Sequence, residues 1–182
     1  ISSYVVVHEP QLHWHEFYEI EYVVSGKAQQ IINGKTYDIG PGYATLISPI
    51  DFHTYKNISP ESPITVINIK FQDLFLPQQL RNDIYVQKRA KVAKLTDERF
   101  GMFMQYLCEE FDKNEYCRDW VIMNGVTQLC VWVMRHILSS EEKELADKVH
   151  SPIQEAVLYV RTHFRSNISA EAVAKTVHLS PN

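Results

Sequence analysis

The sequence predicts an α+β fold in which a β-rich half precedes a helical half. Up to about residue 92, short apolar segments alternate with turn signals, as in a barrel or sandwich of short strands. After Lys91 the turn signals stop, and apolar residues recur at helical spacing. We therefore divide the chain into a β domain at residues 1–92, a helical segment with a linker at 93–150, and a module of short helices at 151–182.

Six segments of the β domain have the composition of strands. They are rich in β-branched and aromatic residues and are bounded by Gly, Pro, Asn and Ser: YVVVH, EIEYVV, AQQII, KTYDI, YATLIS and ITVINIKF. Asn33 and Gly34 separate the third segment from the fourth. Because a type I′ turn needs positive φ at both central residues, this pair predicts a tight hairpin.

The helical segment predicts two helices. The first begins near Thr96, followed by acidic residues in its first turn, and its apolar residues recur at helical spacing. The second is predicted from Tyr116 to Leu138. It carries two apolar stripes, namely Ile122, Val126, Leu129, Val133 and Ile137 on one side, and Trp120, Val131, Met134 and Leu138 on the other.

A helix that is apolar on two sides needs two partners. One partner is the β domain, and we expect the other to be a second subunit, which makes this a dimerisation helix. Either stripe could face the partner, so the candidates come from both: Trp120, Leu129, Val131, Val133, Met134 and Leu138. The alternative is that one large core surrounds the helix.

The last module predicts short capped helices. Ser151 is placed as an N-cap, with Pro152 in the first helical position and Gln154 completing a capping box. A further helix should begin at Ser169, and another at Ser180. Such helices are compatible with a helix-turn-helix, although the same pattern fits many bundles.

Composition excludes several classes of protein. With 45% hydrophobic residues the chain can bury a core, and a net charge of −4 excludes a polybasic nucleic-acid coat. The three cysteines show no CxxC spacing, which indicates reduced thiols in a cytoplasmic protein. No apolar run is long enough to span a membrane. The chain starts at Ile1 without Met, and we interpret it as a fragment.

The stretch HWHEFYE carries the densest chemistry in the sequence. On an extended strand, positions two apart share a face, so His13, His15 and Glu19 would point into one space. Imidazoles with a carboxylate suit either a metal ion or a polar organic ligand, and the alternative is that they only bond to each other's neighbours. No phosphate loop, nucleophile elbow or HExxH motif is present, and no catalytic residue is assigned.

These segments together resemble an AraC-type transcription regulator. HWHEFYEIEYVVSGK, INGKTYDIGPG and LISPIDFH resemble its cupin-like effector-binding barrel, a double-stranded β-helix. The helix pair resembles the segment that follows the barrel and often dimerises in the family. IQEAVLYVRTHFRSNISAEAVAKTVHLSPN resembles the opening of the DNA-binding domain, truncated where the recognition helix begins.

The resemblance implies a site inside the barrel. The effector pocket would contain His13, His15, Glu19, Glu21 and His53. Metal-binding cupins use an HxH motif, a later Glu and a distant His, which implies a tentative metal set of His13, His15, Glu19 and His53, suited to Zn, Ni, Fe or Mn. Pro49 and His53 are one residue closer than in the metal enzymes, with Asp51 in place of Gly, and this spacing looks more like the regulators.

The resemblance implies a ligand-responsive, DNA-binding regulator rather than an enzyme. Its expected partners are a small-molecule effector, with sugars common in the family, a second subunit, and DNA through the full-length C-terminal domain. We expect no membrane partner. The alternative is a metal-dependent cupin enzyme, a dioxygenase or isomerase, which would not need the capped helices after the barrel. Because the recognition helix would begin at Ser180 and stops at Asn182, the fragment should not bind an operator specifically.

Overall fold

The computed structural model describes residues 1–86, 91–139 and 152–180. The chain forms two compact units, residues 1–143 and residues 144–182, which are treated separately below. None of the helices in the described ranges has the length and apolar character that would be needed to cross a membrane.

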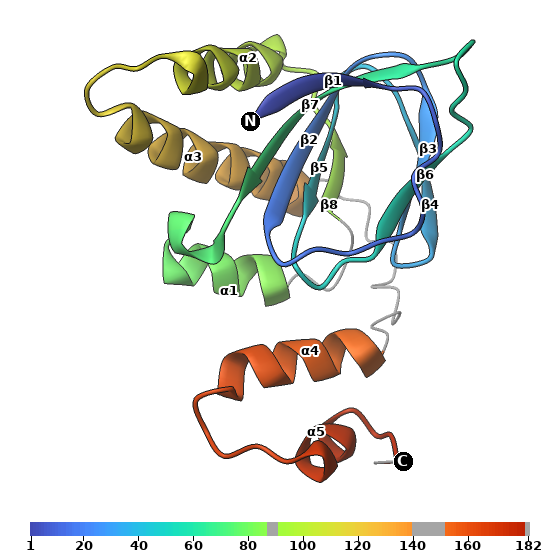
Figure 1. The fold of residues 1–182 in the computed structure, drawn as a ribbon, viewed down its shortest axis with the longest axis vertical. Coiled ribbons are helices and arrows are strands. Elements are labelled where there is room, and N and C mark those ends of the chain that lie inside the picture. The colour runs from blue at the N-terminus through green and yellow to red at the C-terminus, as the bar shows by residue number, and fades with distance from the viewer. Residues whose placement is uncertain (87–90, 140–151, 181–182) are drawn as a thin grey trace. The chain divides into compact units, whose positions relative to one another are not determined.

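The first unit contains two antiparallel sheets. The larger sheet has the strand order β1-β7-β2-β5-β8 and the smaller has the order β4-β3-β6. The strand bounds are β1 Ser2–Val6, β2 Tyr18–Ser25, β3 Ala28–Ile32, β4 Lys35–Ile39, β5 Tyr43–Ile47, β6 His53–Lys56, β7 Ile64–Phe71 and β8 Lys91–Lys94. The two sheets face each other and enclose the interior of a cupin-like barrel (Figure 1).

Strand β2 shows how the sequence separates the two faces of the larger sheet. Tyr18 and Ile20 are buried in the cluster that also contains the helices, whereas Val23 belongs to a second cluster inside the barrel. Because side chains alternate along a strand, Glu19 and Glu21 lie on the same inner face as Val23. The two carboxylates are therefore placed inside the barrel, and both are buried.

The hairpin between β3 and β4 confirms the turn prediction. Ile32 pairs with Lys35, and Asn33 and Gly34 have φ values of 53° and 82°. Both central residues are in the left-handed region that a type I′ turn requires. Three features were not expected from the sequence: β6 lies in none of the six predicted segments, β8 extends the larger sheet beyond residue 92, and a helix, α1, lies between β7 and β8.

The described residues of the first unit also form one 3-10 helix and three α-helices. They are η1 Asp73–Phe75, α1 Gln78–Val86, α2 Glu98–Asp112 and α3 Arg118–Ser139. Helices α2 and α3 lie on the side of the larger sheet away from β3, β4 and β6 (Figure 1). The N-cap of α2 is Asp97, whose side chain accepts from the backbone N–H of Arg99, so the cap is one residue later than Thr96. Phe100, Met104 and Leu107 of α2 are buried against the sheet and α3.

The structure corrects the set of residues expected at a dimer face of α3. Leu129, Val133 and Met134 are buried within the first unit, because both expected stripes contribute to the core around α2 and the sheet. Trp120 remains 66% exposed and Val131 is partly exposed. The side chain of Leu138 lies outside the described residues.

In its described residues, the second unit contains two helices that pack against each other, α4 Pro152–His163 and α5 Ala170–Thr176. Ser169 caps α5, as the sequence predicts, by accepting from the backbone N–H of Ala172 at 3.2 Å. Ala174 and Val177 are buried in this unit. Ser151 and the two residues after Ser180 lie outside the described residues, and the third helix that the sequence predicts from Ser180 stays a prediction.

With two antiparallel sheets followed by helices, the predicted α+β class is confirmed.

Candidate functional site

The stretch HWHEFYE is not one continuous strand. Strand β2 begins only at Tyr18, and the preceding residues form a loop with a single bridge between His13 and His53. The backbone N–H of His13 donates to the carbonyl of His53 at 3.1 Å, and the N–H of His53 donates back at 2.9 Å. The expectation that strand alternation aligns the histidines is therefore wrong, and loop conformation places His15 near β2 and β6 instead.

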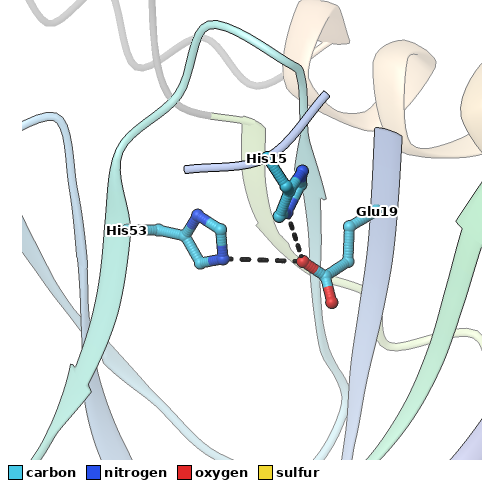
Figure 2. Close-up of side chains that lie close together, drawn as sticks. All are labelled: His15, Glu19 and His53. Carbon is cyan, nitrogen blue, oxygen red and sulfur yellow. Dashed lines mark hydrogen bonds and ion pairs between the residues drawn. The ribbon is translucent and has the colours of Figure 1, made fainter. Parts of the chain in front are cut away.

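Three side chains converge on one point at the edge of the barrel interior. Nε2 of His15 lies 2.7 Å from Oε2 of Glu19, and Nε2 of His53 lies 3.5 Å from the same oxygen. Figure 2 shows the two imidazoles aimed at this single carboxylate oxygen. One ligand atom from each of the three residues lies within 4.8 Å of the others. The three side chains come from a loop, from β2 and from β6.

His13 lies beside this cluster but outside it. Its ring centroid is 4.3 Å from that of His53 and 6.3 Å from that of His15. Its Nδ1 donates to the carbonyl of Gln11 at 2.8 Å, and the residue is exposed. The structure thus brings all four residues of the expected metal set into one neighbourhood, but only three of them present ligand atoms to a common point.

The Glu19 carboxylate is held by donors on both of its oxygens. Oε1 accepts from the amide of Asn68 and lies 3.8 Å from Nζ of Lys70. Burial alone would raise the pKa of Glu19, but hydrogen bonds from His15, His53 and Asn68 outweigh burial and hold that pKa well below its usual range. The group is therefore a carboxylate at neutral pH.

Burial would lower the pKa of His53, yet the pKa is raised. The hydrogen bond to Glu19 and the negative charges of Glu21 and Glu19 outweigh the loss of hydration. The turn that carries His53 is fixed by Asp51, which accepts from the backbone and hydroxyl of Ser48 and from the amide of Asn33 at 2.7 Å. This network sets the position from which the imidazole enters the site.

Glu21 lies farther into the barrel than Glu19, in a fully buried polar layer. Nε2 of Gln30 donates to Oε2 of Glu21 at 2.6 Å, and the hydroxyl of Thr45 donates to the other end of the same amide at 2.7 Å. Burial, together with the charge of Glu19, raises the pKa of Glu21 to about 7. A carboxyl group in this layer can therefore hold or release a proton near neutral pH.

The barrel interior changes from polar to apolar along its length. Beyond the layer of Glu21 the inner face is apolar, with Val23, Ala28, Ile39, Ile58, Ile64 and Val66 in one buried cluster that also includes Tyr55. The polar residues therefore gather toward the end at which His15, Glu19 and His53 meet. The inner face of the barrel therefore presents hydrogen-bonding groups at one end and apolar side chains at the other.

Three polar residues of the interior were missed by the reading of the sequence, namely Gln30, Thr45 and Asn68. Thr45 and Asn68 each lie between two apolar residues of a strand, which was the available signal, whereas Gln30 follows another polar residue, Gln29. Asn68, in ITVINIKF, shares the parity of Val66, so an amide at that position faces the interior. Its Oδ1 has no hydrogen-bond partner among the described residues.

The family comparison matches most of the first unit. The profile of the AraC-like ligand binding domain matches residues 6–130, more than half of the chain. No curated protein sequence matches the chain.

The structural comparison finds chains of the same fold. ToxT from Vibrio cholerae O395 has a TM-score of 0.53 at 12% identity, over 98% of this chain and 68% of that chain. Apo ToxT K231A from Vibrio cholerae strain SCE256 has a TM-score of 0.52 at 12% identity, over 99% and 72%. ToxT from Vibrio cholerae O395 bound to (E)-4-(8-methylnaphthalen-1-yl)but-3-enoic acid has a TM-score of 0.50 at 13% identity, over 98% and 70%. At this level of identity the likeness concerns the fold.

Proposed function

This chain belongs to the AraC-like ligand-binding domain family, and from that premise we propose that it is the sensing part of a ligand-responsive transcription regulator. A small-molecule effector binds inside the barrel, and its binding controls how the C-terminal helices engage DNA. The observation that carries this proposal is the family match over residues 6–130 together with the buried polar layer in the barrel.

The polar layer supports an effector that carries hydroxyl groups, such as a sugar. Glu19, Glu21, Gln30 and Asn68 offer carboxylate and amide groups from four positions on the inner face. Hydroxyl groups can both donate to these oxygens and accept from the amides. One solved chain of this fold, ToxT, has been crystallised with a small organic molecule, which supports small-molecule binding in this architecture.

The second unit supports the DNA-binding part of the proposal. Helix α5 is capped by Ser169 and packs on α4 through Ala174 and its neighbours, as the first helices of a helix-turn-helix would. In the complete regulator, a following recognition helix would enter the major groove. Such a regulator acts in the cytoplasm, where its DNA lies.

A homodimer through α3 is part of the same proposal. The surface still available on that helix centres on Trp120 and Val131, because Leu129, Val133 and Met134 are used by the core. A two-fold contact would bring this face against its own copy.

DNA binding by the natural full-length protein tests the regulator assignment. We expect a site-specific mobility shift at moderate salt with DNA from the region next to its own gene, and a small organic molecule retained by the protein in native mass spectrometry. A scrambled DNA of equal length and composition is the control. Turnover that is lost on chelation, in a protein without specific DNA binding, would instead support the metal-dependent cupin enzyme.

A further inference from the structure

We infer that His15, Glu19 and His53 hold one divalent transition-metal ion, and that His13 is not one of its ligands. The site is a set of two imidazoles and one carboxylate, a combination that suits Zn²⁺ and similar ions and leaves coordination positions open.

The spacing of the donor atoms is the first observation. Two ligands about 2.1 Å from one ion, at tetrahedral or octahedral angles, lie about 3.0 to 3.4 Å apart. The separations from Oε2 of Glu19 are 2.7 Å to His15 and 3.5 Å to His53, on either side of this range. All three donor atoms lie within 4.8 Å of one another (Figure 2), so an ion can reach them through small side-chain rotations.

The hydrogen bonds of His15 are the second observation. Its Nδ1 lies 2.7 Å from the carbonyl oxygen of Phe17. A carbonyl oxygen only accepts, so Nδ1 carries the hydrogen, and in a neutral imidazole Nε2 then carries a lone pair. The contact of 2.7 Å between Nε2 and Oε2 of Glu19 therefore holds a cation, which is either a proton on Nε2 or a metal ion in its place. In metal sites a ligating histidine commonly donates its other N–H to a carbonyl, as His15 does here.

The surroundings of Glu19 and His53 point the same way. Asn68 donates to Oε1 of Glu19, and the half-exposed Lys70 lies near the same oxygen, which leaves Oε2 for the imidazoles. The side chain of His53 is only 3% exposed. Its Nδ1 finds no hydrogen-bond partner of ordinary geometry among the described residues.

The position of His13 separates this site from the four-ligand set that the sequence suggests. The bridge between the backbones of His13 and His53 fixes where His13 enters, and the contact of its Nδ1 with Gln11 turns its ring to the surface. Three protein ligands leave coordination positions of the ion open. On the proposed function, such a position can take a hydroxyl or carbonyl oxygen of the effector, and the ion becomes the anchor of the effector at the polar end of the barrel.

The competing occupant is a proton. A proton on Nε2 would make His15 an imidazolium paired with Glu19, which satisfies the same contact without a metal. Direct measurement of metal binding distinguishes the two occupants.

The experiment titrates Zn²⁺ and Co²⁺ into full-length protein without a histidine tag, after removal of metal by chelation. Calorimetry should give one equivalent per chain, and Co²⁺ should develop the visible absorption of a ligand field with nitrogen and oxygen donors. Glu19→Gln and His15→Ala should each weaken binding by about 100-fold or more. The matched control is His13→Ala, which should change the affinity by less than about threefold if this histidine is not a ligand.

A measurement on the unmodified protein covers the case in which a variant fails to fold. In imidazole ¹⁵N NMR spectra, Zn²⁺ should shift the resonances of His15 and His53 and leave those of His13 and the exposed His8 in place. Absence of stoichiometric binding at saturating Zn²⁺ would overturn the inference, as would equal losses in His13→Ala and His15→Ala. Because no DNA or effector enters these measurements, their outcome is independent of the outcome for the regulator assignment.

Discussion

The Nζ atom of Lys91 lies 3.8 Å from Oδ2 of Asp51, and both side chains are buried. Asp51 belongs to the turn before β6, which presents His53, whereas Lys91 opens β8 at the edge of the larger sheet. Burial would raise the pKa of Asp51, but the charge of Lys91 and hydrogen bonds from Ser48 and Asn33 outweigh it, so that pKa is lowered. The pair therefore joins the turn that carries His53 to the strand that leads into α2.

The two members of this pair should not be equally important for stability. Asp51→Ala should lower the free energy of unfolding by about 3 to 5 kcal/mol, because it leaves Lys91 buried without a counter-charge and removes the acceptor of Ser48 and Asn33. Lys91→Met should cost less, about 1 to 3 kcal/mol, because the buried Asp51 loses its counter-charge but its carboxylate keeps its hydrogen bonds from Ser48 and Asn33. Urea unfolding measures both, and equal losses in the two variants would contradict this account.

The raised pKa of Glu21 predicts a dependence of stability on pH. Its pKa is about 7 in the folded chain against a reference value of 4.5. Between these values the folded state holds a proton that the unfolded state has lost, so the free energy of unfolding falls as the pH rises from about 4.5 to about 7. The total loss is on the order of 3 kcal/mol. Glu21→Gln should remove it, and the variant should therefore be the more stable protein at pH 8 and about equal to the natural one at pH 4.5.

Chemical denaturation across this pH range, with EDTA present, measures the effect of Glu21→Gln. The raised pKa of His53 adds a further loss of stability above its reference value of 6.5. Because the charge of Glu21 contributes to that raised pKa, Glu21→Gln should reduce this loss as well, and the difference between the two proteins reports both groups. Glu16→Gln is the control, because Glu16 is exposed and should leave the profile unchanged. Parallel profiles for natural protein and Glu21→Gln would show that the carboxyl is ionised throughout.

Gly125 of α3 is predicted to be intolerant of a side chain. A Cβ atom there would lie 2.5 Å from Cδ2 and 2.9 Å from Cδ1 of Leu107 in α2, and Leu107 is completely buried. Ala would be favoured over Gly by about 1 kcal/mol in an exposed helix. Here the overlap should outweigh that gain, and Gly125→Ala should destabilise the protein by about 1 to 3 kcal/mol.

Thermal unfolding of Gly125→Ala tests the contact between α2 and α3. Adding Leu107→Val to Gly125→Ala should restore part of the loss, because the smaller side chain removes the atoms nearest to the new methyl group. Gly34→Ala cannot serve as a control for the added methyl group, because Gly34 has a φ of +82° and any side chain there would strain the backbone. If Gly125→Ala were more stable than the natural protein, the prediction would be wrong, because α2 and α3 would then move apart with little loss of free energy of unfolding.

Leu129 and Val131 should respond differently to the same substitution. Leu129 is completely buried, so Leu129→Asp should unfold the first unit, whereas Val131 is partly exposed and Val131→Asp should leave the fold intact. If the exposed face of α3 forms the proposed dimer, Val131→Asp should yield folded monomers. Circular dichroism and sedimentation at micromolar concentration separate these outcomes, and a natural protein that is monomeric there would refute the dimer.

Several elements of the fold were determined by short segments of sequence. The hairpin at Asn33 and Gly34 follows from the φ values that those two residues tolerate, and the cap at Ser169 follows from its side-chain acceptor. The stripe from Ile122 to Ile137 is buried as its helical period indicates. In each case the cause lies within a few residues of the chain, and local spacing is sufficient.

Only the tertiary structure decided which residues meet. His15 approaches Glu19 through a loop rather than through strand alternation, and His53 arrives because β6 pairs with β3 and bridges to His13. The opposite stripe of α3 was divided between core and surface by packing against α2 and the larger sheet, which the spacing of residues within α3 does not indicate. These outcomes depend on strand register and on packing between elements distant in sequence, and the energies that fix them arise only when those elements come together.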